Sequence, residues 1–98
     1  MAASKEILRA LRRIGYTIQP GRGKGSHTLA HFEHQGKEAC VTVVPMGRAI
    51  PKGTLASIKR AIGLTEHGDF EKFMGGGLTR EEYISILLRQ GIIEPQQD

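Results

Sequence analysis

Apolar residues recur with helical spacing at the start of the chain. Four of them share one face of a helix: Ile7, Leu8, Leu11 and Ile14. Basic residues fall largely on the opposite face. Ser4 is a suitable N-cap and Gly15 a suitable C-terminal stop. The pattern therefore predicts an amphipathic helix between Ser4 and Gly15.

The pattern then changes to one that favours strands. Residues 16–18 and 26–33 predict two strands, separated by a glycine-rich loop at 20–25. Residues 40–44 are strongly β-branched and predict a third strand, after a hairpin turn at 34–37. Three consecutive strands joined by short turns predict an antiparallel meander.

A second amphipathic helix follows the predicted meander. Leu55, Ile58 and Ile62 form its apolar stripe, and Gly63 ends it. The element order is therefore α-β-β-β-α, which belongs to the α+β class. Two such helices have one place to bury their stripes, a single face of the sheet. We expect the opposite face to remain open to a ligand.

After Leu64 the composition becomes acidic, which divides the chain into a domain at 1–64 and an extension at 65–98. Residues 66–74 predict a short helix before the hinge at 75–77. Thr79 and Glu82 form a capping-box pattern for a further helix. Its predicted apolar stripe comprises Tyr83, Ile84, Leu87 and Leu88. This helix either packs back on the domain or serves a partner.

Charge separates the two regions more sharply than hydropathy does. Residues 1–64 carry eleven Lys/Arg and three Asp/Glu, whereas residues 65–98 carry three and seven. A strongly basic domain attracts polyanions, of which nucleic acid is the commonest in the cytoplasm. The alternative is that the charge serves only solubility.

The cysteine count and the hydropathy of the chain indicate the cellular compartment. The single Cys40 excludes an intramolecular disulfide framework and a multi-cysteine zinc site. No run of about 18 apolar residues occurs, and the N-terminus does not resemble a signal peptide. We expect a cytoplasmic protein without a membrane partner.

The glycine-rich loop has two interpretations. Its backbone N–H groups could cradle a phosphate, with Arg22 and Lys24 contacting a phosphodiester backbone. However, Lys24-Gly25-Ser26 departs from the P-loop pattern, and a strand follows instead of a helix. The loop could equally be a plain hairpin connection.

The histidines raise the question of a metal. Strand alternation places His27 and His31 on one face, about 13 Å apart, which is too far for two ligands of one zinc ion. We therefore expect no metal and no cofactor. His27 directly follows the loop, and its imidazole could accept or donate a proton near neutral pH. A single strand histidine is, however, more often a surface residue.

The sequence resembles the HicA (YcfA-like) toxin family over about residues 4–65. The resemblance is carried by Ser4-Lys5-Glu6-Ile7-Leu8, Gly15-Tyr16, Lys24-Gly25-Ser26-His27, Val41-Thr42-Val43-Val44-Pro45, Lys52-Gly53-Thr54-Leu55, Ile58 and Gly63-Leu64. It implies a fold similar to double-stranded RNA-binding domains, an mRNA interferase activity that needs no ribosome, and a catalytic histidine at His27. It also implies a HicB-type antitoxin as partner.

Two departures from the family pattern matter. Members often continue the third strand with Pro-x-His, whereas Met46 and Gly47 follow Pro45 here, so a second active-site histidine is not expected. The segment at 66–98 also exceeds the usual compact toxin. Given its charge, we expect its last helix to dock within a homodimer or against the antitoxin.

These observations predict a metal-independent endoribonuclease toxin with His27 as general acid or base. The predicted RNA contacts are Arg22, Lys24, Gly25, Ser26, Lys37, Arg48 and Lys52. One rival is a noncatalytic RNA-binding module on the same scaffold. A second rival is an interaction subunit of an antitoxin complex.

Overall fold

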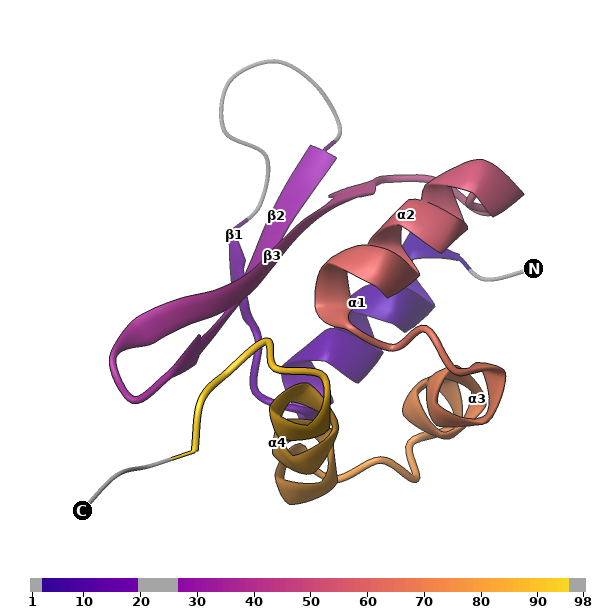
Figure 1. Cartoon of the computed structure of the whole chain (residues 1–98). Coiled ribbons are helices and arrows are strands. Elements are labelled where there is room, and N and C mark those ends of the chain that lie inside the picture. Colours follow the sequence, from indigo (N-terminus) through magenta and orange to yellow (C-terminus); the bar gives the residue numbers. More distant parts are fainter. Residues whose placement is uncertain (1–2, 20–26, 96–98) are drawn as a thin grey trace.

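The computed structural model describes residues 3–19 and 27–95 of the 98-residue chain. The elements in chain order are α1 (Ser4–Arg13), β1 (Thr17–Gln19), β2 (His27–His34), β3 (Lys37–Pro45), α2 (Lys52–Ile62), α3 (His67–Gly75) and α4 (Arg80–Arg89) (Figure 1). The predicted α+β class and the α-β-β-β-α order of the first five elements are confirmed.

The three strands form one antiparallel sheet in the order β1-β2-β3. The hairpin between β2 and β3 turns at Gln35 and Gly36, whose φ angles are 54° and 77°. Two central residues with positive φ match the right-handed twist of the flanking strands, which is why Gly suits the second position. The third strand begins at Lys37, earlier than the predicted 40–44, because its polar first residues pair with the end of β2.

Except at an irregularity between Phe32 and Glu33, side chains alternate between the two faces of the sheet. Thr28, Ala30 and Phe32 of β2 are buried, as are Thr42 and Val44 of β3. The helices lie on this side of the sheet, and the other side is left open (Figure 1). The predicted arrangement of α1 and α2 on one face is therefore confirmed.

The start of α1 differs from the prediction in one detail. Ala3 is the N-cap, and Ser4 is the first helical residue. The Ser4 hydroxyl instead donates to the carbonyl oxygen of Gly47 at 2.9 Å and accepts from the Gly47 N–H at 2.9 Å. Ser4 is 3% exposed, so these two bonds satisfy a buried hydroxyl and fasten the end of β3 to α1.

The C-terminal helices belong to the same hydrophobic core as the rest of the chain. Thr79 and Glu82 form the predicted capping box of α4. Tyr83 and Leu87 are fully buried, and Ile86 is buried beside them, whereas Leu88 is 37% exposed. The predicted stripe was therefore wrong at Leu88, because the buried face of α4 runs through Ile86.

Docking of α4 on its own chain decides between the two alternatives for this helix. Its apolar stripe covers the core formed by α1, α2 and the sheet, and is not free for a homodimer or an antitoxin. The glycines at 75–77 are also more than a hinge. Gly76 (φ 84°) ends α3 in the left-handed conformation, and a Cβ there would lie 2.7 Å from the Arg13 guanidinium.

A buried polar cluster joins α4 to the sheet and to α2. The Tyr83 hydroxyl donates to the Ile62 carbonyl oxygen at 2.6 Å. Because this uses its only proton, Tyr83 must accept the proton of the neighbouring Tyr16 hydroxyl. The Cys40 sulfur lies 3.7 Å from the same Tyr83 oxygen. Burial raises the pKa of both phenols far above the ordinary value of 10.0, so both hydroxyls remain protonated.

Candidate functional site

His27 is the first residue of β2, and its side chain is exposed. In the register of the hairpin it lies opposite Pro45, the last residue of β3. The alternation of β2 directs it to the open face, away from the buried Thr28. An imidazole at the open end of a sheet is accessible to a macromolecular substrate.

Two of the predicted cations are close in the chain to this end of the sheet. Arg48 lies in the loop that follows Pro45, and Lys52 begins α2; both are exposed. The bonds between Ser4 and Gly47 hold that loop against α1. They also bring a cation that the sequence analysis left unassigned, the exposed Lys5, to the same end of the molecule.

Four further predicted contacts lie outside the residues that the structure describes: Arg22, Lys24, Gly25 and Ser26. They stay predictions. The described part of the chain resumes at His27, so these residues directly precede the candidate catalytic side chain in the sequence.

Lys37 lies at the opposite end of the hairpin from His27. It pairs with His34, the last residue of β2, next to the turn. Seven residue steps along β2, at about 3.3 Å each, separate the two ends by about 23 Å. The structure therefore does not bring Lys37 to His27, because the turn of an antiparallel hairpin and its open end lie at opposite ends of the two strands.

The open face has an apolar middle and an acidic end. Val41 and Val43 are 40% and 48% exposed, and Leu29 is opposite Val43 in the register. Toward the turn, the pairing passes from Phe32↔Cys40 to Glu33↔Glu38, which leaves Ala39 of β3 without an opposite residue. This bulge turns Glu38 to the open face, where its Oε1 lies 3.6 Å from His31 Nδ1.

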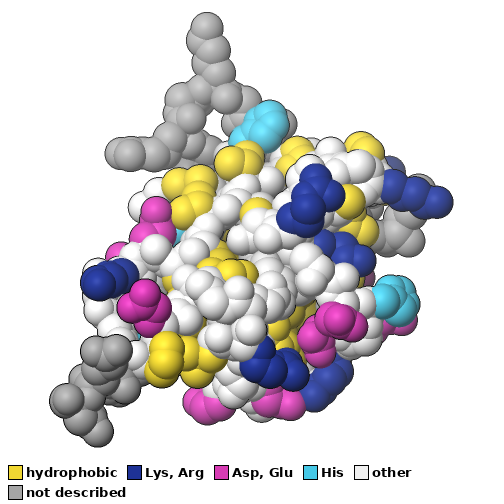
Figure 2. Space-filling view, in the orientation of Figure 1, with side chains coloured by type: hydrophobic (Ala, Val, Ile, Leu, Met, Phe, Trp, Pro, Cys, Tyr) yellow, Lys and Arg dark blue, Asp and Glu magenta, His cyan; other side chains and the backbone are white. Residues whose placement is uncertain are grey.

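Surface charge is distributed unevenly over the molecule. In Figure 2, Asp and Glu side chains lie over the hairpin, α3 and α4 with Lys and Arg side chains among them, whereas the visible surface over α2 carries Lys and Arg. Charges of both signs therefore lie beside the turn of the hairpin, where Lys37 is close in the chain to Glu38. Arg48 and Lys52 follow β3 at the other end of the hairpin, where His27 begins β2.

Comparison with protein families identifies the region that builds this site. A family described as "HicA toxin of bacterial toxin-antitoxin" matches residues 4–64, more than half of the chain. The chain belongs to the HicA toxin family. The comparisons with curated proteins and with solved structures found no match.

The HicA match runs from the first residue of α1 to the residue after the Gly63 cap of α2. It contains His27, Arg48 and Lys52, and it excludes α3 and α4. Membership of this family places the chain in a toxin–antitoxin system, which implies an antitoxin partner in general terms.

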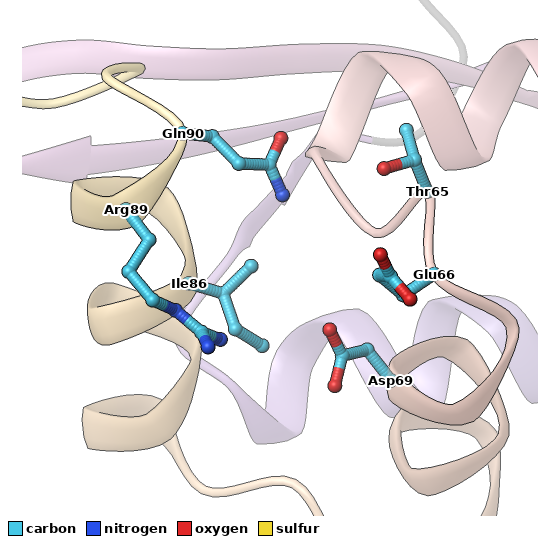
Figure 3. A pocket seen from close by; sticks show the side chains of 6 residues that line it. All are labelled: Thr65, Glu66, Asp69, Ile86, Arg89 and Gln90. Carbon is cyan, nitrogen blue, oxygen red and sulfur yellow. The ribbon is translucent and has the colours of Figure 1, made fainter.

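We call residues 4–64 the HicA region. A hollow of about 600 Å³ lies outside it, beside α4. Asp69 of α3 and Arg89 of α4 point toward each other across it, with Ile86 behind them (Figure 3). The remaining lining residues are Thr65, Glu66 and Gln90. The hollow shares no residue with the surface around His27, so we place the candidate chemistry at the sheet and not here.

Within 3–19 and 27–95, no three His, Cys, Asp or Glu side chains are grouped closely enough to hold a metal ion. Over the same residues, no helix combines the length and the apolar character needed to cross a membrane.

Proposed function

We propose that this HicA-family toxin cleaves RNA without a metal ion, with His27 as the general acid or base. The observation that carries the proposal is the exposed position of His27 at the open end of the sheet. Arg48 and Lys52 follow the opposite strand at that same end. A proton-transfer group with cations at the same end of a sheet is an arrangement that can support phosphodiester cleavage without a metal ion.

The proposed reaction uses the ribose as its nucleophile. The 2′-oxygen forms a bond to phosphorus and loses its proton to a base, while the bond from phosphorus to the 5′-oxygen breaks. The leaving 5′-oxygen takes up a proton. His27 performs one of these two transfers, and the products are a 2′,3′-cyclic phosphate and a 5′-hydroxyl.

Cations support this chemistry by binding the RNA backbone and the charge that develops on phosphorus. Arg48 and Lys52 are the described candidates, and Arg22 and Lys24 are candidates from the sequence. Backbone contacts of this kind fix the position of the RNA without reading its sequence. We propose a HicB-type antitoxin as the partner that inhibits cleavage.

The test compares His27→Ala with His67→Ala on purified protein and a labelled RNA. His67 is the matched control because its side chain is 80% exposed and lies on α3, outside the HicA region. A single general acid–base group contributes about 10²- to 10⁴-fold. We expect His27→Ala to lose about that much cleavage rate and His67→Ala to retain the wild-type rate, with EDTA affecting neither.

Three results would reject this function. The first is a His27→Ala protein that cleaves at the wild-type rate. The second is wild-type cleavage that EDTA abolishes and a divalent ion restores. The third is a wild-type protein that binds RNA and leaves it intact, which is the outcome expected of a noncatalytic RNA-binding module.

A further inference from the structure

The outer edge of β3 has no strand beside it in the described chain. Because the strand order is β1-β2-β3, β3 pairs with β2 on one side only. Within residues 3–19 and 27–95, no backbone hydrogen bond joins β3 to any segment other than β2. A strand at the edge of a sheet presents a row of N–H and C=O groups that can pair with another chain.

Only the two ends of this edge carry features that discourage pairing. Near the turn, β3 begins with the charged Lys37 and Glu38, and the bulge leaves Ala39 without an opposite residue. At the other end, Pro45 lacks a backbone N–H. Charged residues, bulges and prolines protect edge strands from pairing with another chain. The residues between these ends, 40–44, carry none of these protections, and we call them the open edge.

The opposite edge of the sheet is protected by its length. It is formed by β1, which spans the three residues Thr17–Gln19 and pairs with β2. A short edge strand offers few backbone groups to a second chain. The open edge of β3 is therefore the part of the described sheet that is best suited to accept another strand.

The open edge has nearly the same sequence in both directions. Val41 and Val43 flank Thr42, and the apolar Cys40 and Val44 lie at the two ends. In an antiparallel pair of two copies centred on Thr42, Val41 of each copy lies opposite Val43 of the other, and the two Thr42 residues lie opposite each other. Pairs of β-branched residues and Thr–Thr pairs stabilise a sheet, and no like charges are opposed.

A second copy matches this edge better than RNA does. Phosphate oxygens only accept hydrogen bonds, so they would leave the carbonyl groups of the edge without donors. An antiparallel strand supplies both donors and acceptors. Val41 and Val43 are also 40% and 48% exposed on the open face, and a second strand would cover part of this apolar surface.

We infer that two copies of this chain pair along their open edges, which joins their sheets in the order β1-β2-β3-β3-β2-β1. The twofold axis of such a pair is perpendicular to the sheet, so both open faces lie on the same side. His27 lies opposite Pro45. Its two copies would be about 20 Å apart along the strand direction. The pairing leaves both of them exposed on one side of the dimer.

The interface consists of one short pair of strands on each side, and it is small. Interfaces of this kind give weak, concentration-dependent association. We therefore expect the chain to be monomeric when dilute and dimeric when concentrated.

The first experiment measures the mass of the full chain by sedimentation, without antitoxin or RNA, over about a hundredfold range of concentration. The double variant Val41→Lys/Val43→Lys places like charges opposite each other across the interface, whereas Val41→Lys/Val43→Glu places opposite charges there. Both remove the same two apolar side chains, so their difference reports the pairing of these positions. We expect the oppositely charged variant to dimerise at least about tenfold more strongly.

The control for these variants is Leu88→Lys, because Leu88 is another exposed apolar residue, on α4. It should dimerise as the wild type does. A wild-type circular dichroism spectrum and melting temperature confirm that each variant is folded. The difference between the two double variants should decrease when salt is added.

The second experiment keeps the inference testable if the charged variants do not fold. Chains with Val41→Cys and chains with Val43→Cys are mixed, one of them tagged, and oxidised. Opposite residues of an antiparallel pair have Cα atoms about 4.5 to 5.5 Å apart, which suits a disulfide. Two Val41→Cys chains would instead meet diagonally, about 7 to 8 Å apart. We expect the mixture to cross-link faster than either chain alone, and the wild type, whose Cys40 is buried, not to cross-link.

Several outcomes would overturn the inference. A wild type that is monomeric at every concentration, or equal association of the two double variants, would reject pairing at the open edge. Mixed cysteine variants that cross-link no faster than each alone would reject the register. Loss of the dimer in Leu88→Lys alone would place the interface on α4. Because these assays contain no RNA, their result does not depend on the His27 test.

Discussion

The HicA region and the C-terminal region carry opposite charge, yet they share one hydrophobic core. Residues 4–64 contain the candidate site, whereas α3 and α4 lie outside the family match. Tyr83 of α4 is nevertheless among the largest fully buried side chains, together with Phe32 of β2. The end of the family match at residue 64 is therefore not the end of the hydrophobic core, because α4 lies beyond it and contributes buried side chains to that core.

The largest effect should come from removing α4. A chain that ends at Met74 loses Tyr83, Ile86 and Leu87, and loss of each buried side chain of this size costs about 2 to 5 kcal/mol. Domains of this size have a total stability of about 5 to 15 kcal/mol. We expect the truncated chain to lose cooperative unfolding in urea, measured by circular dichroism.

The control for the truncation is Leu88→Ala, which shortens an exposed side chain of the same helix. It should shift the urea midpoint only slightly. A truncated chain that still unfolds cooperatively near the wild-type midpoint would show that the HicA region folds by itself, and the comparison between the two regions would have to be redrawn.

The hydroxyl that joins the two regions should give the next largest effect. Tyr83→Phe removes the donor to the Ile62 carbonyl and the acceptor for Tyr16, so two buried polar groups lose their partner. We expect a loss of about 1 to 3 kcal/mol in the free energy of unfolding. Tyr16→Phe should cost less, because the bond from Tyr83 to Ile62 remains. Equal losses for the two variants in urea titrations would contradict the assigned direction of the bonds.

Local patterns in the sequence predict most of the secondary structure, because capping, turn and periodicity signals act within a few residues. The helices at α1, α2 and α4 and the hairpin follow directly from such signals. The exceptions arise from tertiary contacts. Ser4 binds Gly47 instead of capping α1, and Ile86 replaces Leu88 on the buried face of α4.

The candidate site could be predicted only in part for the same reason. The motif that precedes His27 predicts it as the catalytic residue, and this role stays a prediction; the structure shows that its side chain is exposed. The separation of Lys37 from His27 depends on the register of the hairpin, and the acidic end depends on the bulge at Ala39. Neither the register nor the bulge has a clear signal in the sequence.

The salt dependence of RNA affinity should depend on a basic residue of the HicA region and not on one of the C-terminal region. If Arg48 contacts one phosphate of single-stranded RNA, Arg48→Gln should reduce the slope of log affinity against log salt by about 0.7. Arg89→Gln changes the same type of residue on α4 and should leave the slope unchanged. Fluorescence anisotropy at four or more salt concentrations measures both slopes. A larger change for the α4 variant would show that RNA binds the C-terminal region.

The smallest effect concerns the cap of α4. The hydrogen bond from Lys72, 2.7 Å from Glu82, and the Thr79 N–H hold the pKa of the Glu82 carboxyl below its ordinary value of 4.5. A carboxyl whose pKa is lowered by folding stabilises the folded state above its ordinary pKa, and this contribution is lost as the pH falls through the lowered value. Because Glu82 is solvent-exposed in this contact, the effect should be small. The melting temperature of the wild type should therefore fall slightly more than that of Glu82→Gln between pH 6 and about pH 3. Parallel curves of melting temperature against pH for the two proteins would show that this cap does not help to hold α4 on the HicA region.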